Sequence, residues 1–545
     1  MNATVTPAPP VRQGIGKEEK RVIVASSLGS IFEWYDFYLF ATLAPFFATL
    51  FFPPGNDTAA LLSAFAIYAA GFLVRPFGAL IFGRMGDISG RQHTFLAAIL
   101  VMGLATFAVG LLPTFEAIGW AAPVLLGALR LLQGLALGGE YGGATVYIAE
   151  HATPRYRGYL TSWIQTTATL GLLLTLVVIG VCRFSGLMTP ADFAEWGWRI
   201  PFLASIVLLI FSAYIRLKLN ESPIFRRMKA EGKGSAQPLT DSLLRYPNNK
   251  FVLLALFGAA AGQGVVWYTG QVYALFFLTG TLNLDGRTAY SLLAIALLLG
   301  TPFFVFFGWL SDRIGRLRII LAGCLLAALT YLPLFQALTH YVNPALERYQ
   351  ASHAITVAAN DCNVHVVVTP FTRYSDCDRV RDFLTKSGLP FRFSDLPAGS
   401  TDTVITRIGD TEIRGWNEGG ALREALAATG YPPSADLAAV NWPMTLLILL
   451  VMLLYVTMTY GPIAAYLAEL FPTRVRYTSM SLPYHIGNGW FGGMLPLLAT
   501  ALVVATGNIY YGLWYPVVVA MATAVIGLFF LPETRNRDIT ADIGN

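Results

Sequence analysis

The 545-residue chain contains twelve apolar stretches, each long enough to cross a membrane as a helix. A helix needs about 20 residues to cross a hydrocarbon core, and each stretch reaches that length. The chain is 55% hydrophobic and only 13% charged, which excludes an ordinary string of soluble domains. The sequence therefore predicts an all-α membrane protein with twelve transmembrane helices. The stretches lie near residues 23–50, 59–82, 94–113, 119–148, 158–182, 199–217, 251–280, 288–310, 318–340, 443–467, 477–505 and 510–531.

Two motifs occur once in each half of the chain. The turn that runs from Gly83 to Arg91 returns 225 residues later, and the segment from Tyr147 to Arg157 returns 319 residues later. The two copies are Gly83-x-x-x-Asp87-x-x-Gly90-Arg91 with Gly308-x-x-x-Asp312-x-x-Gly315-Arg316, and Tyr147-Ile-Ala-Glu150 plus Arg157 with Tyr466-Leu-Ala-Glu469 plus Arg476. These repeats predict two copies of one six-helix unit. The second copy has gained 94 residues, the difference between the two offsets.

The Lys and Arg residues gather in alternate loops. The loops after spans 2, 4, 6, 8 and 10 are basic, whereas those after spans 1 and 3 carry no Lys or Arg. Since basic loops stay inside, both termini are predicted to be cytoplasmic, in a multi-pass protein of the cell (inner) membrane. The expected units are a disordered cytoplasmic tail (1–21), a six-helix bundle (22–217), a cytoplasmic linker (218–249), helices 7–9 (250–340), an extracytoplasmic insert (341–441), helices 10–12 (442–531) and a cytoplasmic tail (532–545).

Ionisable residues inside the spans mark a candidate transport site. They are Glu33 and Asp36 in the first span, Arg75 in the second, and Arg130 and Glu140 in the fourth. Charges at that depth are costly, so they face a cavity or a partner. Glu33 and Asp36 share one helix face, and a buried ion pair with no transport role is the competing explanation. Pro76 cannot donate a backbone hydrogen bond, which predicts a local kink beside Arg75.

Several motifs together resemble those of the major facilitator superfamily. The repeated turns resemble its loop 2–3 and loop 8–9 signatures, and Arg130-x-x-Gln133-Gly134 resembles a span 4 motif associated with proton coupling. Glu33-Trp-Tyr-Asp36-Phe, Arg75-Pro-Phe-Gly and Gly138-Gly-Glu140-Tyr-Gly resemble the metabolite:proton symporter family, whose members carry α-ketoglutarate, citrate, shikimate, proline or betaine. The resemblance implies a major facilitator fold of two six-helix halves and proton-coupled uptake of a small metabolite.

Three groups of candidate residues follow from these motifs and from the polar residues of the spans. The proton-coupling candidates are Asp36, Glu33, Glu140 and Arg130. The substrate-binding candidates are Arg75, Arg130, Tyr35, Gln133, Tyr141, Gln165, Trp267, Tyr268, Gln271, His485 and Asn488. The gating candidates are Gly83, Asp87, Gly90, Arg91, Glu150, Arg157, Asp312, Arg316, Glu469 and Arg476. His485 stays open between a substrate contact and a hydrogen-bonded interior residue. The two arginines stay charged and either pair with the acids or hold a substrate carboxylate.

The insert between helices 9 and 10 has the pattern of a small α/β domain. We expect strands at Asn363–Thr369, Pro390–Phe393, Asp402–Ile408 and Thr411–Arg414, and helices at Asp376–Lys386 and Glu418–Ala428. This order resembles a thioredoxin/glutaredoxin-like domain in which Cys377 begins the first helix. Tyr374 stands where that family has its first redox cysteine, so the resemblance implies a degenerate module without thiol chemistry. A structural role and a platform for an extracytoplasmic protein partner are both open.

The two cysteines of the insert give that assignment a test. If Cys362 begins the first strand, seven or so extended residues separate it from Cys377 by roughly 23 Å. A disulfide needs Cα atoms about 6 Å apart. The prediction is therefore two unpaired thiols without exchange activity, and a Cys362–Cys377 bridge would contradict the glutaredoxin-like fold assignment of the insert while leaving the transporter prediction untouched.

Taken together, the sequence predicts a secondary active transporter that imports a small polar metabolite, most simply an organic acid, by proton symport. The alternatives are a zwitterion symporter of the proline or betaine kind, a proton-independent facilitator or exchanger, and a non-transporting sensor. We expect no enzymatic activity, no metal, no nucleic-acid partner and no cofactor other than protons as the coupling ion. The expected partners are the small-molecule substrate and membrane lipid, and the expected state is a monomer.

Overall fold

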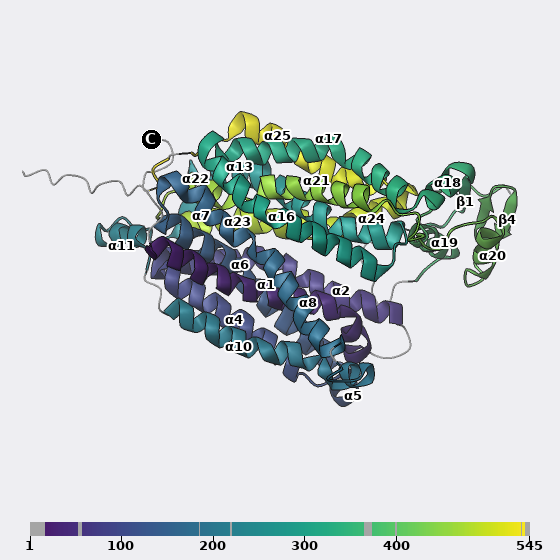
Figure 1. Cartoon of the computed structure of the whole chain (residues 1–545), viewed down its shortest axis with the longest axis horizontal. Helices are drawn as coiled ribbons and strands as arrows, with labels where there is room; N and C mark the ends of the chain where they lie inside the picture. The colour runs from purple at the N-terminus through teal and green to yellow at the C-terminus, as the bar shows by residue number, and fades with distance from the viewer. Residues whose placement is uncertain are drawn as a thin grey trace, which may run out of the picture.

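The structure is a computed structural model that describes residues 17–52, 57–184, 186–217, 221–363, 373–397, 400–535 and 537–539. Two helical bundles lie side by side, and a small α/β unit projects from one end (Figure 1). Most of the predicted tail at residues 1–21 lies outside the described part, in which α1 starts at Lys17. We call the end beside α11 (Pro223–Ala230) the linker end, and the opposite end the insert end.

The N-terminal half is built from the first group of long helices. They are α1 (Lys17–Phe51), α2 (Asp57–Leu73), α3 (Arg75–Ser89), α4 (Arg91–Leu111), α6 (Ala121–His151), α7 (Arg157–Gln165), α8 (Thr167–Phe184) and α10 (Arg199–Leu217), with short α5 (Phe115–Ile118) and α9 (Pro190–Asp192) between them. The second predicted span breaks at Val74, directly before Arg75 and Pro76. Because Pro76 lacks a backbone N–H, it cannot donate a helical hydrogen bond there, and α3 starts at Arg75 just before it. The kink itself stays a prediction.

The C-terminal half follows the linker helices α11 and α12 (Pro238–Leu243). Its first span joins α13 (Asn248–Ala255), η3 (Leu256–Ala260), α14 (Ala261–Tyr268), η4 (Thr269–Tyr273), α15 (Ala274–Phe276) and η5 (Phe277–Thr281). The other spans are α16 (Gly286–Ile314), α17 (Arg316–Val342), α21 with α22 (Trp442–Tyr460, Ile463–Leu470), α23 with η6 and α24 (Arg476–His485, Ile486–Gly492, Leu495–Thr506), and η7 with α25 (Tyr511–Leu513, Trp514–Phe530).

Ten helical segments within the described residues are long and apolar enough to cross a membrane. The short apolar α10 and the 35-residue α1 supply the remaining two of the twelve predicted helices. The two halves meet along α3, α6 and α7 on one side and α16, α22 and α23 on the other. Both predicted gating turns end at this contact.

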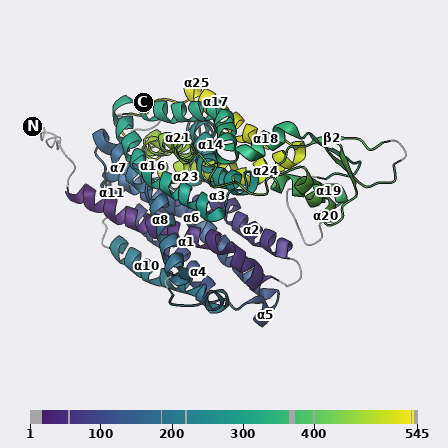
Figure 2. The ribbon, with the colours of Figure 1, turned by 45° about the vertical axis from the view of Figure 1, so that its right-hand side comes forward.

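The insert contains a four-stranded sheet and helices on either side of it in the sequence, and Figure 2 shows it projecting beyond the insert end of the bundles. After α18 (Pro344–Ser352) come β1 (Ile355–Ala358), α19 (Asp376–Lys386), β2 (Arg392–Ser394), β3 (Ile405–Ile408), β4 (Thr411–Arg414) and α20 (Gly420–Ala428). The strand order is β2-β1-β3-β4, with β1 parallel to β2 and antiparallel to β3. Helix α19 and strand β4 have the bounds predicted from the sequence.

The prediction of two free thiols in the insert is wrong. Cys362 and Cys377 form a disulfide, with 5.3 Å between their Cα atoms. The first described strand of the sheet is β1 at Ile355–Ala358, so Cys362 follows this strand instead of beginning one, and it lies beside Cys377 at the start of α19. The strand predicted at Asn363–Thr369 lies outside the described residues apart from Asn363. The estimated separation was too large because Cys362 and Asn363 are not in a strand, and the disulfide counts against the glutaredoxin-like assignment of the insert.

Loss of this disulfide is expected to destabilise the insert. The two cysteines are 15 residues apart, and a loop of that length contributes about 3 kcal/mol when it is closed. We expect Cys362→Ala with Cys377→Ala to raise the amide hydrogen-exchange rate of α19 in the full-length protein. The matched control is Cys182→Ala with Cys324→Ala, which removes the two buried free thiols instead. Alkylation of Cys362 and Cys377 in the untreated native protein would contradict the disulfide.

Candidate functional site

Two buried arginines lie close together in the N-terminal half. Arg75 begins α3 and is 5% exposed, and Arg130 lies within α6 and is 2% exposed. Their guanidinium carbons lie 4.9 and 5.1 Å from the ring centre of Phe37 in α1. Arg75 also lies 4.4 Å from the ring of Phe72, and Arg130 lies 4.9 Å from that of Tyr68. Aromatic faces thus hold both cations in place of a carboxylate.

Much of the hydrogen-bonding capacity of these arginines is unused. Arg130 donates through Nη1 to Oε1 of Gln133 at 3.1 Å, and Gln133 in turn donates to Thr106 at 2.8 Å. The Nε and Nη2 atoms of both arginines have no hydrogen-bond partner among the described residues. Neither arginine forms an ion pair within that same part of the chain. Unpaired buried donors on two like charges are costly, so this arrangement is suited to an incoming anion.

The candidate acids lie on the helices that carry or contact these arginines. Asp36 is buried in α1, one residue before Phe37. Glu140 is buried in α6, where its Oε1 accepts from the Ser30 hydroxyl at 3.4 Å. The side chain of Glu33 lies outside the described part of the structure.

Aromatic rings from the two halves contact each other where the halves meet. Trp34 of α1 stacks on Trp267 of α14, with ring centres 6.3 Å apart. Tyr141 of α6 stacks at 3.6 Å on Tyr484 of α23. These contacts lie at the interface of the halves, so any movement of one half against the other must change them. Sequence reasoning proposed Trp267 and Tyr141 but missed Trp34, Phe37 and Tyr484.

The other candidate substrate-binding residues are polar or aromatic side chains, most of them in the C-terminal half. His485 follows Tyr484, is 1% exposed, and has no hydrogen-bond partner on either ring nitrogen among the described residues. Asn488 and Gln263 exchange hydrogen bonds at 2.7 and 3.2 Å, which occupies the Asn488 amide within its own half. Gln165 donates to the Tyr141 hydroxyl at 2.8 Å. Tyr268 and Gln271 are buried in α14 and η4.

Tyr35 lies apart from these side chains. Its hydroxyl donates to the Pro201 carbonyl at 2.8 Å, and its ring belongs to a separate core cluster with Phe47 and Trp198. Tyr35 therefore points into the N-terminal half, as its position one residue from Trp34 and Asp36 on the helix allows.

The predicted gating residues converge at the linker end, where each half binds a helix start of the other. The carboxylate of Asp87 accepts from the backbone N–H groups of Tyr477 and Thr478, at 3.2 and 2.9 Å, at the start of α23. A carboxylate at a helix N-terminus is stabilised both by these donors and by the helix dipole.

The repeat-matched residue Asp312 makes the mirror contact. Its carboxylate accepts from the N–H groups of Gly158 and Tyr159, at 2.9 and 2.8 Å, at the start of α7. The 225- and 319-residue offsets of the sequence therefore correspond to one pseudo-twofold arrangement in space.

Buried ion pairs join these caps into one network. Across the halves, Arg476 pairs with Glu150 at 2.6 Å, and Arg157 pairs with Glu469 at 2.9 Å. Within the halves, Arg91 pairs with Asp87 at 2.7 Å and Arg316 with Asp312 at 2.6 Å; Arg91 and Arg316 also reach Glu150 and Glu469 at 3.4 and 3.0 Å. We call these residues the gate: Asp87, Arg91, Glu150, Arg157, Asp312, Arg316, Glu469 and Arg476. These ion pairs join the two halves at the linker end in this structure.

Glycines permit this close approach. Gly90 and Gly315 both have φ of 118°, which side chains rarely adopt, and a Cβ on either would meet a glutamate side chain. A Cβ on Gly83 would lie 2.9 Å from the Thr478 Cα across the interface. Gly308 is equally tight against Ser162 of the other half.

Sequence reasoning missed Glu221 and Glu533, the two glutamates that pack on those glycines. Glu533 accepts from the backbone N–H groups of Arg316 and Leu317 at 2.7 and 3.1 Å, and Glu221 accepts from that of Gln92 at 3.2 Å. Each caps the helix after a gating turn. The available signal was position: Glu221-Ser-Pro and Glu533-Thr-Arg each follow the last span of a half.

Comparison with known proteins agrees with this fold. The family model for "Sugar (and other) transporter" matches residues 22–242 and 429–541, and that for "MFS/sugar transport protein" matches residues 145–367. The chain is 36% identical to the shikimate transporter of Escherichia coli (strain K12) over 325 residues, 58% of this chain and 72% of that protein. It is 34% identical to the α-ketoglutarate permease of the same organism over 322 residues, covering 59% and 72%. A solved structure of the proton:xylose symporter XylE from E. coli, bound to 6-bromo-6-deoxy-D-glucose, shares the fold with a TM-score of 0.62 at 16% identity, covering 96% of this chain and 98% of that one.

Proposed function

Because the chain belongs to the major facilitator superfamily, in its family of sugar and other transporters, we propose that it couples proton entry to the uptake of a small organic anion. The chain is a multi-pass membrane transporter of a small metabolite and not an enzyme. The relatives named above carry shikimate and α-ketoglutarate, which are both carboxylates at neutral pH. The proton coupling and the anionic substrate are the proposal.

The observation that supports an anionic substrate is the pair of buried arginines, which have no ion-pair partner among the described residues. Arg75 and Arg130 lie on the same aromatic group with unused N–H donors on both. A carboxylate that entered between the halves would satisfy these donors and neutralise charge that the rings only partly compensate. A quaternary ammonium compound would instead meet two fixed positive charges.

The proposed orientation places the gate on the cytoplasmic side. The linker helix α11 carries exposed Arg226, Arg227 and Lys229, as the positive-inside rule requires of a cytoplasmic segment. The insert at the other end would then be outside, where the Cys362–Cys377 disulfide is stable against reduction. With the gate closed, the substrate site would be reached only from outside. Opening of the gate would release substrate inwards.

Uptake into proteoliposomes with an imposed pH gradient tests this function. We expect accumulation of a labelled carboxylate, from a panel of shikimate, α-ketoglutarate and citrate, only when the exterior is acidic. Accumulation of proline or betaine alone would favour a zwitterion symporter. Uptake that only equilibrates would favour a facilitator, and no uptake of any compound would favour a sensor.

Removal of one arginine charge is expected to weaken substrate binding. Each of Arg75→Gln and Arg130→Gln should raise the KM for the carboxylate at least tenfold, since a hydrogen bond to a charged group contributes about 1.5–3 kcal/mol. The matched control is Arg287→Gln, at an exposed arginine at the start of α16. An unchanged KM in both variants, with normal yield and monodispersity, would remove these arginines from the substrate site.

A further inference from the structure

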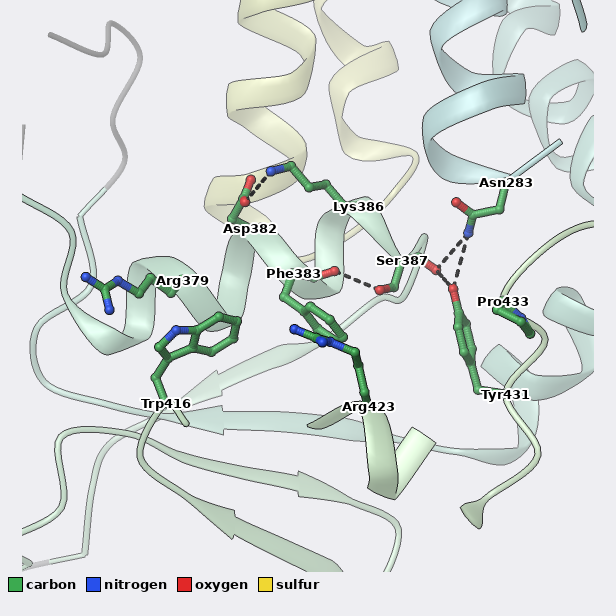
Figure 3. A pocket seen from close by; sticks show the side chains of 10 residues that line it. All are labelled: Asn283, Arg379, Asp382, Phe383, Lys386, Ser387, Trp416, Arg423, Tyr431 and Pro433. Atoms are coloured by element: carbon green, nitrogen blue, oxygen red, sulfur yellow. Dashed lines mark hydrogen bonds and ion pairs between the residues drawn. The ribbon is translucent and has the colours of Figure 1, made fainter. Parts of the chain in front are cut away.

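A cavity of about 440 Å³ lies where the insert rests on the transport domain. Cavities of about 300–1,000 Å³ are the usual size of small-molecule sites. Figure 3 shows the side chains that line it. They come from one face of α19 and the residue after it (Arg379, Asp382, Phe383, Lys386, Ser387), from the segments around α20 (Trp416, Arg423, Tyr431, Pro433), and from the loop between η5 and α16 (Asn283).

The cavity carries an excess of positive charge. Asp382 is its one lining carboxylate, and that group pairs with Lys386 at 2.5 Å. Arg379 and Arg423 form no ion pair within the described residues. Arg423 donates through Nη2 to the Glu418 carbonyl at 2.6 Å, which fixes the direction of its guanidinium and leaves other N–H donors available. Two exposed arginines in one cavity are suited to hold an anionic group.

Two aromatic rings form an apolar part of the cavity wall. Phe383 and Trp416 pack edge to face, with ring centres 6.1 Å apart and an angle of 65° between the rings. Both rings are only half-buried, so part of each faces the cavity. Such a surface stacks with a planar apolar group better than with a flexible chain or a hydrated sugar.

The far wall is fixed by hydrogen bonds between the insert and the transport domain. Tyr431 donates to the Ser387 carbonyl at 2.7 Å, and the Asn283 amide donates to the Tyr431 hydroxyl at 3.2 Å. Burial raises the pKa of the Tyr431 hydroxyl, so it remains a donor at neutral pH. Gly388 packs directly on the Thr281 carbonyl at the end of η5. The wall is therefore complete only in the full chain.

We propose that this cavity binds a small aromatic carboxylate, with the ring against Trp416 or Phe383 and the carboxylate at Arg423, whose guanidinium lies beside these rings in Figure 3, while Arg379 adds positive charge to the same cavity. The site is separate from the buried arginines of the transport centre and does not depend on the proposed transport mechanism. Asn283 in the far wall lies just after the span that carries Trp267 and Tyr268. A ligand in the cavity therefore stabilises the position of the end of that span.

Calorimetric titration of the full-length protein in lipid nanodiscs tests the proposal, with benzoate and 4-hydroxybenzoate as probes and uncharged benzamide as the neutral comparison. We expect saturable binding of at least one carboxylate and at least tenfold weaker binding of benzamide. Arg379→Gln with Arg423→Gln should weaken carboxylate binding at least tenfold, and so should Trp416→Ala alone.

The matched control is Arg348→Gln with Arg392→Gln, which removes the same charge from exposed positions of the insert that do not line the cavity. This variant should bind within about twofold of the wild type. Absence of saturable binding of both carboxylates, equal binding of benzamide, or equal weakening by the control pair would each overturn the proposal. Carboxylate binding that survives the Arg379 and Arg423 substitutions would also overturn it, because the ligand would then occupy another site.

Discussion

Asp87→Ala is expected to open the linker end of the transporter. The substitution removes the carboxylate that accepts two backbone N–H groups at the start of α23 in the other half. It also leaves Arg91 buried with one fewer partner. Hydrogen bonds to a charged acceptor contribute about 1.5–3 kcal/mol each, so we expect the ratio of open to closed gate to rise at least tenfold. Asp312→Ala should act in the same direction, because it removes the symmetric cap of α7.

Spin-label distances across the linker end measure this shift. Labels at Ser89→Cys in one half and Arg318→Cys in the other lie on exposed positions, while Cys182 and Cys324 are buried. We expect a longer distance population in both Asp variants. The control is Asp285→Ala, which removes a cap of the same chemistry from α16 but within one half and at the insert end. An unchanged distance distribution in both gate variants, or the same shift in the control, would contradict the gating role.

The fold could be predicted from the sequence because its strongest signals are local. A membrane demands apolar stretches of fixed length, and the gating turns repeat residue by residue. Asp87 and Asp312 could be paired by their offsets alone, before their contacts with α23 and α7 were known.

The predictions failed where long-range pairing decides the outcome. The Cys362–Cys377 disulfide depends on which short segment forms the first strand, and four residues at 355–358 carry little periodic signal. Glu221 and Glu533 lie outside the repeated motifs, so their capping of α4 and α17 became evident only in three dimensions. The direction of Tyr35 depended on helix rotation, which a sequence motif does not fix.

The candidate substrate site around Arg75 and Arg130 was likewise predicted only in part. Arg75 and Arg130 were evident as charges in apolar spans, but their shared contact with Phe37 was not, since aromatic residues are common in every span. The informative feature is that neither arginine has an ion-pair partner within the part of the chain that the structure describes. A sequence predicts that buried charges are compensated, and the structure places aromatic faces where a carboxylate was one of the expected partners.

Asp36→Asn is expected to abolish accumulation driven by the pH gradient while substrate exchange continues. Asp36 is buried in α1 next to Phe37, the ring shared by Arg75 and Arg130. Protonation of an acid at this position would change the charge that the two arginines present to an anion, which is how proton and substrate binding become linked. One coupled proton and a gradient of one pH unit support a concentration ratio of about ten, and the variant should fall to one.

A counterflow experiment measures the exchange of labelled for unlabelled substrate. It distinguishes a proton-carrying Asp36 from an Asp36 that only forms a permanent structural ion pair. If Asp36 carries the proton, the Asn variant exchanges labelled for unlabelled substrate at a rate near that of the wild type. If Asp36 is only structural, exchange and accumulation fall together. Glu140→Gln is the parallel variant, since Glu140 is a buried acid of α6, the helix that carries Arg130, and Asp192→Asn in short α9 is the surface control. Full concentrative uptake by Asp36→Asn with its loss in Glu140→Gln would transfer the coupling role to Glu140, because a symporter cannot concentrate its substrate without a group that exchanges the proton.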